Sequence, residues 1–322
     1  MRPEVQKGRR RRVAAALKAA FGLTVFGAIV WYLVPTWDGL IGQVRVSPFM
    51  LGLAFTGTAL VHVVVALRWK ILSEAMGGTR LRLRSYLHSL VLTRFLGQFT
   101  PALAMDLVGR GVALKSAGSE RGLGHATTLV ILERILDVVA PVTLLAWAFG
   151  VRQYGLETRA GILLAVGTAT FVGLATWLLR PLAALGMRVY GVLRHTDVGE
   201  LRIELAMGLS LRVALLSVVR FAGVLLQFAA IGAGIGVALP WLSWVAATPI
   251  AQITGMIGIT PGGLGVLEAG WWGGLAWVGV EPERVALFLL AQRAALVTFL
   301  GLLTLLVWPF ARRASVARTE TT

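Results

Sequence analysis

Cysteine is absent from the 322 residues of this chain, and acidic residues are few, with 15 Asp and Glu against 31 Lys and Arg. Without cysteine the chain has no disulfide, no thiolate metal site and no cysteine nucleophile. The four histidines show no metal-ligand spacing. The HExxH, GxSxG and P-loop patterns are missing too, which argues against the common hydrolases and against an ATP-driven pump. We therefore expect no enzyme activity, no metal and no cofactor.

Apolar residues, by contrast, are abundant: they make up 57% of the chain, and the mean hydropathy is +0.78. Soluble domains contain about 45–50% apolar residues. Several apolar runs reach about 20 residues, enough to cross a hydrocarbon core of about 30 Å as helices. No alternating strand pattern indicates a β-barrel. The sequence therefore predicts an all-α polytopic membrane protein.

The net charge of +16 comes from basic residues that cluster between the apolar runs. This distribution is typical of cytoplasmic loops and of attraction to anionic lipid, and we do not interpret it as a nucleic-acid surface. It predicts a basic cytoplasmic N-terminus at residues 1–12, a single transmembrane domain at residues 13–310 and a cytoplasmic C-terminal tail at residues 311–322. The first apolar run lacks a small-residue cleavage site, so we interpret it as an anchor helix and not as a signal peptide.

About six full crossings are expected from the lengths of the apolar runs. Their approximate ranges are residues 13–34, 48–72, 123–149, 160–179, 209–239 and 285–310. A basic stretch from Arg180 to Arg202 follows the fourth crossing, and we expect an amphipathic helix there on the inner membrane surface.

Two further segments do not fit simple crossings, and we predict that each forms a re-entrant broken-helix hairpin. The first, about residues 85–112, has basic residues at both ends and contains Pro101; the second, about residues 241–280, contains the stretch GITPGGLGVLEAG with Pro261. Non-helical backbone at membrane depth is tolerated only where it is buried in protein or lines an aqueous cavity. Pro101 and Pro261 are therefore the predicted hinges at a functional site.

The two hairpins also resemble each other. Each contains a Thr-Pro turn, and an arginine in the next long helix follows the proline by 33 residues in the first hairpin (Arg134) and by 32 in the second (Arg293). The distribution of basic residues predicts that the two hairpins enter the membrane from opposite sides. Opposed broken helices at matching positions are typical of inverted-repeat transporters that bind substrate near the midplane.

Ionisable residues inside the apolar runs are the candidate site residues, because each costs roughly 2.5–3.5 kcal/mol to insert at a helix centre. Glu133 and Asp137, four residues apart on one helix face, form either a structural ion-pair knot or a gating and coupling network. Arginines outnumber carboxylates, which indicates an anionic group to be bound. The complete set is Arg68, Arg94, Asp106, Arg110, Glu133, Arg134, Asp137, Arg220, Glu268 and Arg293.

The stretches TPGGLGVLEAG, LERILDVV, ALRWKIL and TPALAMDLVGR together resemble the lysylphosphatidylglycerol synthase transmembrane-region family, the flippase part of the multiple peptide resistance factor. The resemblance implies a polytopic fold with re-entrant helices that moves lipids between leaflets. We expect a stand-alone member without the aminoacyl-transferase domain. The first hairpin departs from the family pattern, with Ala104-Met105 before Asp106 where a small Gly-Gly or Gly-Glu pair is expected. The family's motif positions correspond here to Arg68, Pro101, Asp106, Arg110, Glu133, Arg134, Asp137, Pro261–Gly265, Glu268 and Arg293.

These observations lead to the hypothesis of a lipid flippase or transporter for an anionic or phosphate-bearing lipid in the cytoplasmic (inner) membrane of a bacterium. Its partners are membrane lipids, not nucleic acid, and a homo-oligomer remains open. Two alternatives are an integral membrane enzyme that acts on a lipid phosphate and a non-transporting scaffold of an envelope-synthesis complex.

Within the flippase hypothesis, each group of residues has a predicted role. The lipid phosphate is held by arginine side chains and by the glycine backbone of the second hairpin, which lets a ligand approach closely. Close helix packing by small residues is the alternative for these glycines. The predicted substrate-binding residues are Arg110, Arg134, Arg293, Gly262, Gly263 and Gly265. The predicted coupling or gating residues are Asp106, Glu133, Asp137 and Glu268.

Overall fold

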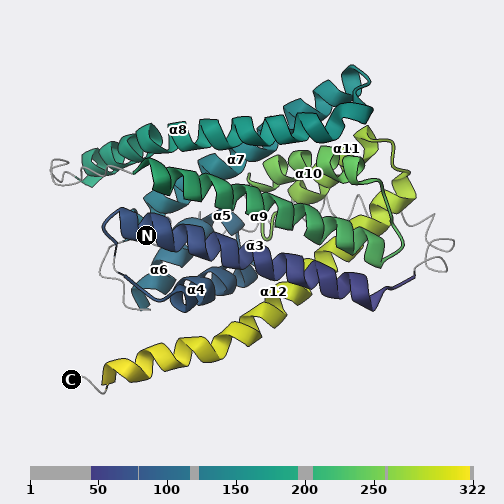
Figure 1. Cartoon of the computed structure of the whole chain (residues 1–322). Coiled ribbons are helices and arrows are strands. Elements are labelled where there is room, and N and C mark those ends of the chain that lie inside the picture. Colours follow the sequence, from purple (N-terminus) through teal and green to yellow (C-terminus); the bar gives the residue numbers. More distant parts are fainter. Residues whose placement is uncertain (1–44, 79, 117–122, 195–205, 258–259, 320–322) are drawn as a thin grey trace, which may run out of the picture.

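A computed structural model describes residues 45–78, 80–116, 123–194, 206–257 and 260–319 of the chain (Figure 1). The described residues form helices and contain no strand, so the predicted all-α fold is confirmed. The first predicted crossing (13–34) and the basic N-terminus (1–12) lie outside the described residues.

Four of the helices are long and apolar enough to cross a membrane, as expected of a multi-pass membrane protein. The candidate spans are Pro48–Ala75 (α3), Ala160–Leu185 within α8, Met207–Gly234 (α9) and Pro282–Pro309 within α12. They correspond to four of the six predicted crossings. A fifth predicted crossing corresponds to α7, a continuous helix from Leu123 to Gln153.

Three predicted helix ends differ from the structure by five residues or more. Helix α8 continues through Pro181 as far as Arg194, so the fourth crossing extends without a break into the stretch where an amphipathic helix was predicted, and residues 195–202 of that stretch lie outside the described residues. A proline within a transmembrane helix removes one hydrogen bond, which neighbouring groups can compensate. Helix α9 ends at Gly234, before the predicted residue 239, and Gly236 with φ 88° follows it. Helix α12 (Pro282–Thr319) continues past the predicted end at residue 310.

Helices α3 and α9 lie antiparallel through the centre of the bundle (Figure 1). The side chain of Ser47 caps the start of α3, where Pro48 occupies the first turn. The Ser47 N–H donates to the carbonyl of Gly234 at the end of α9, 2.8 Å away. Gly57 allows the two backbones to approach closely, because a Cβ there would lie 3.0 Å from the Gln227 nitrogen. Small residues thus set the helix separation, as is common in membranes.

Two broken segments occupy opposite ends of the bundle. The first comprises α4 (Leu83–Leu96), α5 (Ala102–Ala104), the π-helical turn η2 (Met105–Gly109) and α6 (Arg110–Ser116). The second comprises α10 (Trp241–Gly255) and α11 (Val266–Trp277). Figure 1 shows α4 and α6 at one end of the molecule and α10 and α11 at the other. Both predicted hairpins are therefore interrupted near their Thr-Pro turns.

Each broken segment packs against the long helix that follows the other one in sequence. Helix α4 packs on α12, and α10 packs on α7. As a result the two Thr-Pro turns meet, and Pro101 and Pro261 form an isolated antiparallel bridge. The Gly262 N–H donates to the carbonyl of Gly97 at 2.8 Å. We call this contact between the turns the proline joint.

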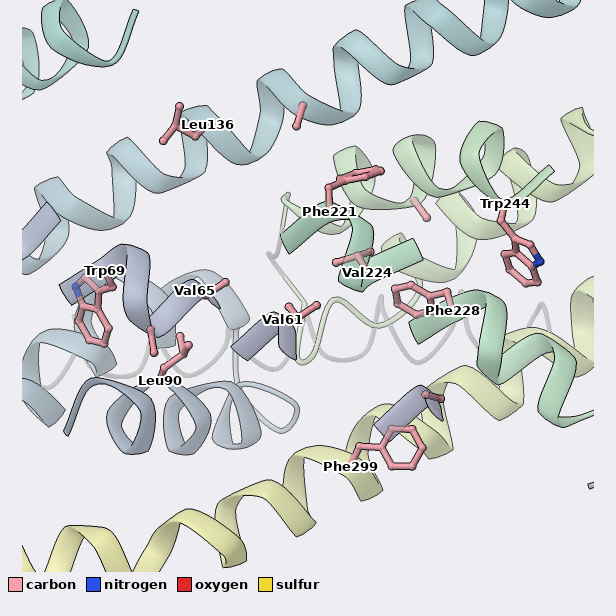
Figure 2. Close-up of a cluster of buried hydrophobic side chains, with 14 of the residues drawn as sticks. Val61, Val65, Trp69, Leu90, Leu136, Phe221, Val224, Phe228, Trp244 and Phe299 are labelled. Atoms are coloured by element: carbon pink, nitrogen blue, oxygen red, sulfur yellow. The ribbon is translucent and has the colours of Figure 1, made fainter. Parts of the chain in front are cut away.

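Buried apolar side chains fill the space between the helices and form one large cluster. Figure 2 shows Val61, Val65 and Trp69 of α3 with Phe221, Val224 and Phe228 of α9 in one cluster. The same cluster reaches Leu136 of α7, Trp244 of α10 and Phe299 of α12 (Figure 2). Any charged group between these helices is therefore removed from lipid and depends on protein partners.

Candidate functional site

Eight charged side chains from six helical segments meet in the interior, and we call them the central ion cluster. The segments that supply them are α3, α4, η2, α6, α7 and α9. The members of the cluster are Arg68, Arg94, Asp106, Arg110, Glu133, Arg134, Asp137 and Arg220.

Two arginines of the cluster are fully enclosed, and each of them contacts two carboxylates. Arg68 lies 3.7 Å from Glu133 and 2.7 Å from Asp137, so it bridges the two carboxylates predicted to share one face of α7. Arg110 lies 2.6 Å from Glu133 and 3.2 Å from Asp106, and its guanidinium stands 5.3 Å from the ring centre of Trp69. The side chains of both arginines are at most 2% exposed. This inner part has the geometry of a structural ion-pair knot that ties α3, α6 and α7 together.

The other three arginines have only one carboxylate partner each among the described residues. Arg94 approaches Asp106 through one terminal nitrogen at 3.3 Å, and Arg134 bonds the same carboxylate oxygen through one nitrogen. Arg220 reaches Asp137 through one nitrogen at 3.5 Å. Their side chains are 31%, 20% and 12% exposed, respectively. Most of their hydrogen-bond donors are therefore free to bind another group.

These three arginines line a cavity of about 200 Å³, which we call the central cavity. Asp106 and Asp137 lie in the same wall. The proline joint also contributes to the wall of the cavity, where Gly262 and Gly263 line it together with Gln98. Further polar side chains in the wall are His62, Thr93, Gln227 and Gln252. The cavity therefore lies between both halves of the chain, with basic and amide groups facing it.

A second ion pair, Glu268 with Arg293, supports the proline joint from the C-terminal half. Arg293 donates to Glu268 from two nitrogens, and it also donates to the carbonyl of Gly262 at 2.9 Å. The other oxygen of Glu268 accepts from the Gly265 N–H at 2.7 Å and so caps α11. The carboxylate is 0% exposed. Glu268 and Arg293 thus hold the second turn in place.

The glycine backbone of the second turn is engaged in the turn itself. The N–H of Gly262 bonds to the first turn, that of Gly263 to Thr260 and that of Gly265 to Glu268. A Cβ on Gly262 would lie 2.8 Å from the carbonyl oxygen of Gln98, and φ at this glycine is +58°. Glycine is therefore required here for the close approach of the two turns.

The structure brings only part of the predicted site together around the cavity. Among the predicted substrate-binding residues, Arg134, Gly262 and Gly263 line it, whereas Arg110, Arg293 and Gly265 lie outside its wall. Among the predicted coupling residues, Asp106 and Asp137 line it. Glu133 lies in the ion-pair knot and Glu268 at the second turn.

Arg94 and Arg220 were recognised in the sequence as intramembrane charges, but not as candidate ligands. The amides of Gln98, Gln227 and Gln252 were not recognised at all. Gln227 interrupts the apolar run FAGVLLQFAA, and Gln252 interrupts PIAQITG. A lone polar residue in a membrane helix usually faces the bundle interior or a cavity, so this signal was present in the sequence.

The two halves of the chain contain matching ion pairs. Asp106 follows Pro101 by five residues and is bonded by Arg134 of the next long helix, α7. Glu268 follows Pro261 by seven residues and is bonded by Arg293 of the next long helix, α12. The spacing from proline to arginine noticed in the sequence thus corresponds to an arginine that reaches back to its own broken segment.

A family model described as lysylphosphatidylglycerol synthase TM region matches residues 19–305 of this chain. No curated protein matches the sequence.

Proposed function

Because this chain belongs to the lysylphosphatidylglycerol synthase TM region family, we propose that it is a flippase or transporter that moves an anionic lipid between membrane leaflets. In this proposal the central cavity binds the lipid head group, while the acyl chains remain in the bilayer. The protein carries out no chemical step on the lipid, and the lipid is its partner.

The observation that carries the proposal is that the three arginines lining the central cavity, Arg94, Arg134 and Arg220, have hydrogen-bond donors not used by carboxylates. Each has donors that are not used by carboxylates, and all three face one cavity inside an apolar bundle. Guanidinium groups match phosphate oxygens in pairs and stay charged in any environment. Intramembrane charges that line a cavity mark substrate pathways. An anionic head group is the ligand that fits this set of donors.

The arrangement of the two halves supports a transport cycle with alternating access. Broken segments at opposite ends, cross-packed on the long helices of the other half, are what an inverted repeat of two re-entrant hairpins requires. The proline joint lies beside the cavity and connects the two hairpins. We propose that rearrangement of this joint, with the coupling carboxylates Asp106 and Asp137, opens the cavity to each leaflet in turn.

The proposed location is the cytoplasmic membrane of a bacterium, with both termini in the cytoplasm. The basic segments between the apolar runs support this orientation. A membrane potential of 100 mV is worth about 2.3 kcal/mol per charge moved, which is enough to bias an anion outward.

Leaflet exchange in proteoliposomes tests the proposal. Tail-labelled fluorescent anionic phospholipids are quenched from outside with dithionite, and we expect wild-type protein to accelerate exchange over protein-free vesicles. Arg134→Gln removes charge-assisted hydrogen bonds, each worth about 1.5–3 kcal/mol, so exchange should fall by about tenfold or more. Asp106 keeps Arg94 and Arg110 as partners in this variant, so the fold should be retained.

The matched control is Arg212→Gln. Arg212 is exposed on α9 and does not line the central cavity. Exchange should be unchanged in this variant when the reconstituted amounts are equal. If wild-type protein exchanges no anionic or zwitterionic lipid, the transport proposal is wrong, and the enzyme and scaffold hypotheses gain support.

A further inference from the structure

Building on the proposed function, we infer that the central cavity selects a lipid phosphomonoester, whose head group is one terminal phosphate with two negative charges, over lipid phosphodiesters. The inference concerns the class of the head group. It comes from the charge balance of the central ion cluster, from the number of free arginines and from the size of the cavity.

Among the residues that the structure describes, the charge balance of the cluster leaves two positive charges uncompensated. Five arginines face three carboxylates, and every one of these carboxylates already contacts at least two arginines. His62 lines the cavity and bonds through Nδ1 to the Thr58 carbonyl at 2.7 Å, and we count it as neutral. Glu268 and Arg293 neutralise each other. In an apolar bundle, uncompensated charges are costly, so the best ligand supplies two negative charges.

The free donors also match a terminal phosphate. Arg94 and Arg134 meet at one oxygen of Asp106, and Arg220 lies beside Asp137. Positions 134 and 137 are three residues apart on α7 and so share one face of that helix. All three guanidiniums line the same cavity. A phosphomonoester presents three acceptor oxygens and carries a charge of about −1.5 to −2 at pH 7, whereas a diester carries a single charge.

The size of the cavity argues for a single small group. Its volume of about 200 Å³ is below the roughly 300–1,000 Å³ of sites that enclose a whole small-molecule ligand. One phosphate group fits within this space. A single phosphate can match the uncompensated charge of the cluster only as a monoester.

The inference is tested by equilibrium binding to the full chain purified in a neutral detergent. The probes are tail-labelled phosphatidic acid, which is a monoester, and tail-labelled phosphatidylglycerol, which is a diester with the same acyl chains. We expect the Kd for phosphatidic acid to be about tenfold lower at pH 8, equivalent to about 1.4 kcal/mol. The ratio should shrink at pH 5, where the phosphate of phosphatidic acid carries one charge.

Removing one cavity charge should remove the preference. Arg220→Gln leaves Asp137 paired with Arg68, and Arg94→Gln leaves Asp106 paired with Arg110 and Arg134. In both variants the ratio of the Kd for phosphatidylglycerol to the Kd for phosphatidic acid should approach one. The reason is that the variants lose more affinity for phosphatidic acid than for phosphatidylglycerol. Arg212→Gln, the exposed control on α9, should keep the wild-type ratio.

Four outcomes are contrary to the inference. Equal affinity of the wild-type protein for both lipids, or tighter binding of cardiolipin than of phosphatidic acid, would overturn the monoester class and leave the transport proposal intact. Displacement of both probes by inorganic phosphate as effectively as by unlabelled phosphatidic acid would show that free phosphate, not a lipid, is the ligand. Binding of neither lipid, together with no leaflet exchange, would remove the proposed function itself.

Discussion

Glutamine in place of Glu133 is expected to destabilise the folded protein by about 3–5 kcal/mol, the range measured when one partner of a buried ion pair is removed. The Glu133 carboxylate lies between Arg68 and Arg110, at 3.7 and 2.6 Å. All three side chains are at most 3% exposed. Glutamine keeps the shape but not the charge, so two buried guanidiniums lose their shared counter-charge. The measurement is the apparent Tm in detergent, followed by tryptophan fluorescence.

The control for this prediction is Glu74→Gln. Glu74 pairs with Lys70 at 2.8 Å, and both side chains are about a quarter exposed, at 25% and 27%. Pairs of this kind contribute at most about 1 kcal/mol, so the Tm should change little. A second variant, Glu133→Gln with Arg110→Gln, should be less destabilised than the sum of its two single changes. Equal loss of Tm in Glu133→Gln and Glu74→Gln would contradict the ion-pair knot.

The second large effect is expected for Gly262→Ala, which acts on the proline joint. A Cβ there would lie 2.8 Å from the Gln98 carbonyl oxygen and 3.0 Å from an Arg293 nitrogen. The left-handed backbone of an alanine costs about 1–2 kcal/mol, and the overpacking adds about 1–3 kcal/mol. We expect a lower Tm and a loss of leaflet exchange, because the two turns can no longer approach each other.

Gly263→Ala separates the two contributions. Gly263 has a similar φ of +69°, but the nearest atom to its added Cβ is the Leu267 Cβ at an ordinary 3.8 Å. This variant should lose only the backbone contribution, so its Tm should lie between that of the wild type and that of Gly262→Ala. If the two alanine variants behave alike, close contact of the turns at Gly262 is not needed for function.

Much of the architecture was predictable because it depends on local sequence. Apolar runs of about 20 residues predict membrane helices, and the Thr-Pro turn and glycines near Pro261 predicted the break between α10 and α11. The end of α8 was not predictable in this way. The apolar run predicted an end at residue 179, yet α8 continues through Pro181 to Arg194, since a single proline removes only one backbone hydrogen bond.

The candidate site was predictable as a set of residues but not as an arrangement. Intramembrane charge identified Arg94, Arg110, Arg134 and Arg220 together, because insertion cost depends on composition alone. Composition does not tell which of them contact two carboxylates and which contact only one. Arg110 lies in the ion-pair knot with two carboxylates, whereas Arg94 and Arg220 face the cavity with one each. The difference arises from which helices pack against α7.

The sequence by itself determined that this is a helical membrane protein of the matched family, with broken segments at two prolines and more buried arginines than carboxylates. These properties follow from hydropathy, from proline and glycine geometry and from counting charges. Only the tertiary structure decided that the two turns meet at Pro101 and Pro261, that Glu133 belongs to a buried knot and that three arginines keep free donors in one cavity. The physical reason is that pairing between charges depends on distances across helices, and those distances are set by packing of residues far apart in the chain.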